Sequence, residues 1–195
     1  MKKLKKGLML IFIAAIVSVF GEICGLVSKS TMFNITNELF LSILDICSIV
    51  SIVVYLVLFI WGIKLIRPEN KNFAIAYDLV FTAIILGFGI ILYNNEAIID
   101  LSETLFEGIF LFFVCRGLAE VFKKKKNNTL AKYMSKAKVI ILLAYIGMAI
   151  CNFWLQANTL NNEDVNFIFD LLLLPCSLIA LCWPVNAFSK AIDNL

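Results

Sequence analysis

The chain has 195 residues, of which 62% are hydrophobic and 16% charged, with a mean hydropathy of +0.94 and a formal net charge of +3. Soluble domains are about half apolar and a quarter charged, so this composition excludes an ordinary soluble protein and predicts a polytopic membrane protein. The chain has no histidine, which excludes the usual His-based zinc centres, His-general-base triads and haem ligation by histidine.

The first apolar segment follows the basic residues Lys2, Lys3, Lys5 and Lys6. A cleaved secretory signal begins in the same way, but its apolar region is roughly 7–15 residues long and ends at a small-residue cleavage site. Here the apolar stretch continues through Val27 without such a site. We therefore predict a retained helix that crosses the membrane.

Six apolar segments have about the length, roughly 20 residues, that a helix needs to cross a bilayer. Breakers or polar clusters separate them, such as the sequence Arg67-Pro68-Glu69-Asn70. We predict an all-α fold, a polytopic membrane helix bundle of six transmembrane helices that forms a single integral membrane domain over residues 1–195. The predicted spans are residues 7–28, 39–66, 73–93, 97–122, 139–157 and 165–188.

The positive charges orient the predicted bundle. Fifteen of the 17 lysines and arginines lie before the first span, around the second and fourth loops, or after the last span. Because such residues collect on the cytoplasmic side, we predict a multi-pass protein of the cell membrane with both termini in the cytoplasm. The abundance of isoleucine, lysine and asparagine favours a bacterial origin.

The longest run of positive charges follows the fourth span, at Lys123–Lys126. Its position beside a span accounts for it as a topological signal in contact with lipid headgroups. Nothing aromatic accompanies these charges, so we expect the lipid bilayer, and no nucleic acid, as their partner. Thr129 is a candidate cap for a short amphipathic helix over residues 130–138, at the membrane interface before the fifth span.

The second, fourth and sixth spans begin alike. Each has an aspartate among apolar residues and a small residue seventeen positions later. The aspartates are Asp45, Asp100 and Asp170, and the small residues are Gly62, Gly117 and Ala187. This pattern favours three tandem helical hairpins, although the odd-numbered spans repeat poorly. The aspartates fit either helix caps near the outer interface or an outward-facing acidic ring that gathers cations.

The fourth span carries carboxylates along one stripe. At 100° per residue, Asp100, Glu103 and Glu107 fall within an arc of about 60°. Glu107 lies about 10 Å deeper than Asp100, near the middle of the membrane, where ionisable residues often mark a substrate or proton path. Glu22, in the first span, joins this stripe if it faces the interior of the bundle.

The alternative for Glu107 is a protonated side chain that is hydrogen-bonded across the bundle. Its candidate partners are Ser48, Ser51 and Asn152. In that case the deep carboxyl group has a structural role and no part in a path.

Two further ionisable residues lie at matching depth from the cytoplasmic side. Asp78 is in the third span and Arg116 in the fourth, and these spans are consecutive and antiparallel. An arginine inside a span needs a partner, so we predict a structural Asp78–Arg116 ion pair, with Glu120, one turn beyond Arg116, as the competing partner. The six cysteines form no Cys-x-x-Cys pair, so we expect packing roles for them and neither a metal site nor a cofactor.

These patterns leave three functions open. The first is transport or capture of a small solute, a cation or a proton along a path of acidic residues: Glu22, Asp100, Glu103 and Glu107. The second is a non-catalytic accessory, regulatory or immunity-type protein that packs against a larger membrane protein or against copies of itself. The third is an intramembrane carboxylate-dependent enzyme. We expect no enzyme, because helix capping already accounts for aspartates that share one depth.

Overall fold

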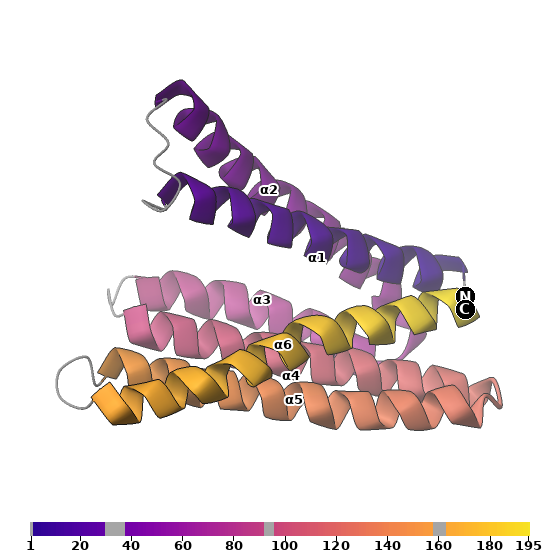
Figure 1. Ribbon diagram of the computed structural model, residues 1–195. Helices are drawn as coiled ribbons and strands as arrows, with labels where there is room; N and C mark the ends of the chain where they lie inside the picture. Colours follow the sequence, from indigo (N-terminus) through magenta and orange to yellow (C-terminus); the bar gives the residue numbers. More distant parts are fainter. Residues whose placement is uncertain (1, 30–37, 92–95, 158–162) are drawn as a thin grey trace. The chain divides into compact units, whose positions relative to one another are not determined.

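The computed structural model describes residues 2–29, 38–91, 96–157 and 163–195 (Figure 1). These residues contain helices and no strand, which confirms the predicted all-α class. The helices are α1 Lys2–Lys29, α2 Glu38–Ile66, the short 3-10 helix η2 Arg67–Glu69, α3 Lys71–Ile91, α4 Glu96–Lys124, α5 Asn128–Ala157 and α6 Glu163–Asn194.

Four helices among the described residues are long and apolar enough to cross a membrane, which supports a membrane protein. The candidate crossing segments are Lys2–Gly21, Leu39–Glu69, Asn128–Leu155 and Leu171–Asn194. The other two of the six predicted spans, in α3 and α4, stay predictions. In α4 the apolar stretch is interrupted by Glu107, Arg116 and Glu120.

The helices form two compact units. One consists of α1 and α2, and the other of η2 and α3–α6. In the second unit each helix packs against the next one in the chain, α3 against α4, α4 against α5 and α5 against α6. A single domain over residues 1–195 stays a prediction.

The α1–α2 hairpin is closely packed because small buried residues recur every seven positions along α1, at Gly7, Ala14 and Gly21. Gly7 lies opposite Gly62 of α2, where a Cβ atom added to Gly62 would meet the Gly7 carbonyl oxygen at 2.8 Å. Gly21 lies opposite Ser51, so the two helices are antiparallel. Small residues let the backbones of membrane helices approach in this way.

The α3–α6 unit buries large apolar side chains between its helices, among them Phe73, Leu118, Phe122 and Met134. Gly117 of α4 faces Phe73 of α3, where an added Cβ would meet the aromatic ring at 2.5 Å. The small residues of the hairpin pattern, Gly62, Gly117 and Ala187, are all buried. The tandem repeat itself stays a prediction.

Helix α5 corrects two predictions about the fourth loop. It is one continuous helix from Asn128 to Ala157, so residues 130–138 are not a separate interfacial helix. Asn127, and not Thr129, caps it, because the Asn127 Oδ1 atom accepts a hydrogen bond from the backbone N–H of Leu130 at 3.2 Å. Because α5 is continuous from its capped start, it has no break between residues 130–138 and the predicted fifth span.

Candidate functional site

The predicted acidic path falls on two helices. Asp100, Glu103 and Glu107 belong to α4, and Glu22 belongs to α1. Glu107 is exposed, whereas the side chains of the other three lie outside the part of the chain that the structure describes. Glu107 is therefore the residue of the predicted path whose side chain the structure describes.

Glu107 lies on the stripe of α4 that faces the core of its unit. Towards the C-terminal end of α4, this stripe continues through Leu111, Val114 and Leu118, each within about 40° of Glu107 at 100° per residue. These three side chains are buried, and none is more than 6% exposed. The stripe therefore passes from packed core to accessible surface at the level of Glu107.

The contact between α4 and α5 is close at the same level. A Cβ atom added to Gly108 would meet the Cβ atom of Tyr145 at 2.5 Å. Tyr145 is 6% exposed, so its ring fills the interface between the two helices. Glu107 thus directly precedes a residue at which α4 and α5 are in close contact.

Two other roles were considered for the carboxylates, a hydrogen bond across the bundle and the binding of a metal ion. Ser51, a candidate partner of Glu107, donates its hydroxyl hydrogen to the carbonyl oxygen of Cys47 at 2.7 Å. A hydrogen bond between Glu107 and Ser48, Ser51 or Asn152 stays a prediction. Among the described residues, no group of three or more cysteines, aspartates or glutamates is placed to hold a metal ion.

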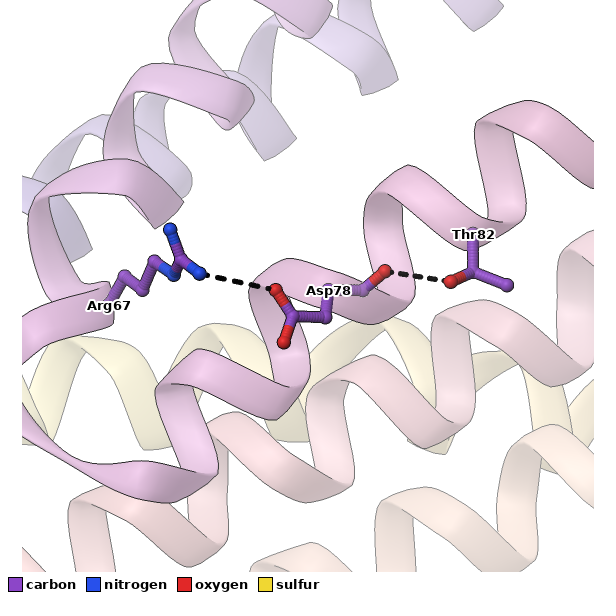
Figure 2. Close-up of polar contacts among 3 residues, drawn as sticks. All are labelled: Arg67, Asp78 and Thr82. Carbon is purple, nitrogen blue, oxygen red and sulfur yellow. Dashed lines mark hydrogen bonds and ion pairs between the residues drawn. The ribbon is translucent and has the colours of Figure 1, made fainter.

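The ion pair of Asp78 differs from the predicted one. Its Oδ1 atom lies 3.6 Å from the Arg67 Nη2 atom, and the Thr82 hydroxyl donates to the Asp78 carbonyl oxygen at 2.9 Å (Figure 2). The Arg67 guanidinium also lies over the Tyr77 ring, 4.5 Å from its centroid. Among the described ion pairs, Asp78 is thus joined to η2, and the expected Asp78–Arg116 pair is not formed.

The direction of the helix face explains this difference. Phe73 and Ala76 are apolar residues that α3 buries, and Asp78 lies about 140° and 160° away from them around the helix. The carboxylate therefore points away from the packed side of α3, although the sequence predicts the same depth for Asp78 and Arg116. Since the Arg67 and Asp78 side chains are 50% and 65% exposed, their pair contributes under about 1 kcal/mol to stability.

Glu120 forms a polar cluster with two asparagines. The sequence had indicated Glu120 only as an alternative partner of Arg116. Its Oε2 atom accepts a hydrogen bond from Asn70 Nδ2 at 2.7 Å, and its Oε1 atom accepts one from Asn72 Nδ2 at 2.8 Å. Arg116 and Lys124 add favourable interactions with its negative charge. Asn72 is 6% exposed, so this cluster fixes the start of α3 against α4 through a buried amide.

Sequence reasoning missed the role of the two asparagines. Asn70 precedes α3, and its Oδ1 atom accepts a hydrogen bond from the Asn72 backbone N–H at 2.8 Å, as an N-cap side chain does. The signal was present as an asparagine directly before an apolar-periodic segment.

The chain matches no known family model, no curated protein and no solved structure.

Proposed function

We propose that the chain is a membrane protein for transport or capture of a small solute, in which Glu107 binds a cation, a proton or a basic group. The observation that supports this proposal is the accessibility of Glu107 next to the buried Leu111, Val114 and Leu118 on the same stripe of α4. A carboxylate in the middle of a bilayer costs several kcal/mol unless it is paired, hydrated or neutralised. In this proposal, a cation or proton bound at Glu107 offsets part of that cost.

The path would begin at the N-terminal end of α4. Asp100 and Glu103 precede Glu107 on the same helical stripe, so a cation that enters there meets successive carboxylates. Beyond Glu107 the stripe is closed by the buried Leu111 and Val114. Release on the other side would therefore need α4 to move relative to its neighbours, as alternating access requires.

An accessory membrane protein is the second candidate, and the exposed apolar surface of α2 is compatible with it. Only 6% of the most apolar window of the crossing segment Leu39–Glu69 is buried. An apolar surface of this extent suits lipid, a larger membrane protein or a second copy of the chain. In this alternative, Glu107 would meet a polar group of the partner.

Site-directed labelling distinguishes the two candidates. In a cysteine-free background reconstituted in lipid, Glu107→Cys should react with a membrane-impermeant maleimide, because an aqueous path keeps its thiol hydrated and ionisable. Leu111→Cys should stay unlabelled, since Leu111 is 6% exposed.

Leu143→Cys is the matched control. Leu143 is 63% exposed and lies within one turn of Tyr145, which contacts Gly108, so its depth is close to that of Glu107. It should also stay unlabelled, because apolar surface at this depth faces lipid. If Glu107→Cys is as unreactive as Leu143→Cys, the aqueous path does not exist and the transport proposal fails.

A further inference from the structure

Exposed lysines gather at one end of the α3–α6 unit, where α4 ends, α5 begins and α6 ends. The set is Lys123, Lys124, Lys125, Lys126, Lys132, Lys136 and Lys190, here named the basic end. The Lys125 Nζ atom donates to the carbonyl oxygen of Asn194 at 3.3 Å, and Lys190 Nζ lies 4.2 Å from the Tyr133 ring centroid. These two contacts join the C-terminal part of α6 to the α4–α5 turn.

Backbone hydrogen bonds close the turn that follows Lys123 and Lys124. The Asn127 N–H donates to the Phe122 carbonyl oxygen at 2.9 Å, and the Lys126 N–H donates to that of Lys123 at 3.0 Å. This pair of hydrogen bonds is a Schellman motif, which closes the C-terminus of α4. Because Asn127 also caps α5, the two helices follow each other without a flexible linker.

Lys126 has an unusual backbone conformation for its type. Its φ angle is 61°, in the left-handed region that glycine adopts most readily. Glycine is the usual residue at this position of a Schellman motif. A positive charge therefore stands where backbone geometry alone would favour a residue without a side chain, and such outliers are a reason to look for a function.

The charges of the basic end are not balanced by nearby acids. Helix α5 contains no aspartate or glutamate, and Asp193 is the acidic residue of the last turns of α6. Glu120, the acidic residue of the last turns of α4, is already hydrogen-bonded to Asn70 and Asn72. The lysines of the basic end therefore outnumber the acidic residues beside them, and their exposed ammonium groups can receive an external anion.

We propose that the basic end binds the headgroups of anionic phospholipids such as phosphatidylglycerol. Helix α5 has 30 residues, about 45 Å at 1.5 Å per residue, whereas the hydrocarbon core is about 30 Å thick. Because the lysines of α5 lie near its start, at Lys132, Lys136 and Lys138, we place the surplus length and the adjoining turn at headgroup level. Lysines clustered beside a span attract anionic lipids, and long lysine side chains reach the phosphates from the helix surface. This inference does not depend on the proposed transport.

The test compares lipid affinities of the purified full-length protein by native mass spectrometry. Phosphatidylglycerol and phosphatidylcholine are titrated separately, and the ratio of their dissociation constants is the lipid preference. We expect the wild type to prefer phosphatidylglycerol by about tenfold or more, and the K123Q/K124Q/K125Q/K126Q variant to lose most of this preference. The corresponding quadruple arginine variant should keep it, because it retains the charges.

The matched control removes the same number of charges elsewhere, as K2Q/K3Q/K5Q/K6Q. This variant should keep the larger part of the preference, because the α1 lysines are not held in the α4–α5 turn. Equal losses in the two glutamine variants, or no loss in the first, would overturn a specific surface. Tighter binding of a duplex DNA probe than of phosphatidylglycerol would replace the lipid by nucleic acid and would also refute the proposal. Unchanged circular dichroism and elution volume establish that the variants are folded.

Discussion

Replacement of Gly62 by alanine tests the close approach of α1 and α2. The added Cβ would meet the Gly7 carbonyl oxygen and the Ile11 Cγ1 atom at 2.8 Å each, and the Ile11 backbone nitrogen at 3.1 Å. Two of these three atoms belong to the backbone, so a side-chain rotation does not relieve the collision. The helices must separate instead.

The expected magnitude follows from two opposing effects. Overpacking in a well-packed interface costs about 1–3 kcal/mol, and alanine in a helix interior is favoured over glycine by roughly 0.5–1 kcal/mol. Because the collision involves backbone atoms, we expect Gly62→Ala to lower the free energy of unfolding by about 1–2 kcal/mol. Unfolding by SDS in mixed micelles, followed by circular dichroism, measures the change.

Gly147→Ala is the control for this experiment. It adds the same methyl group where the nearest atoms are Cys176 Sγ at 2.8 Å and Cys176 Cβ at 3.8 Å. Rotation of the Cys176 side chain relieves this contact, so the free energy of unfolding should stay within about 1 kcal/mol of the wild type or rise. If Gly62→Ala is as stable as Gly147→Ala, the inferred backbone contact between Gly7 and Gly62 is wrong.

Two further predictions concern the ends of α4 and α3. Glu120→Ala should lower the free energy of unfolding by about 1 kcal/mol, because it removes an acceptor from the buried Asn72 amide. Glu120→Gln keeps one acceptor oxygen, so its free energy of unfolding should fall less. Equal losses of the two variants in SDS unfolding would contradict this prediction. Lys126→Gly should raise the free energy of unfolding by about 1 kcal/mol, because glycine adopts a φ of 61° without steric strain. A lower SDS midpoint for Lys126→Gly would show that the Schellman turn is not formed in the membrane.

The positions of most helices were predictable because breakers and polar clusters stand between apolar runs. Helix α2 spans Glu38–Ile66 against the predicted 39–66, and α4 spans Glu96–Lys124 against the predicted 97–122. The start of α5 was not predictable in this way. The lysines of residues 128–138 indicate where the hydrocarbon core ends, but a helix continues into water wherever its residues favour it and a cap begins it.

The order of the candidate site residues along α4 was predictable, but their accessibility was not. The spacing of Asp100, Glu103 and Glu107 follows from the helical period alone, whereas the accessibility of Glu107 depends on how far the neighbouring helices cover α4. Asp78 shows the same distinction. The sequence predicted the same depth for Asp78 and Arg116, but the direction of Asp78 on α3 brought it to Arg67.

The amino-acid sequence by itself determined that this chain is an all-helical protein suited to a membrane, and it placed the ionisable residues along each helix. Hydropathy and the helical period are properties of consecutive residues, so they can be read without knowledge of any partner. Only the tertiary structure decided which stripe of each helix is covered, that Gly7 meets Gly62, and that Asn70 and Asn72 bind Glu120. These contacts join residues about 50 positions apart, and they form only where two specific helix faces pack at one depth and in one direction.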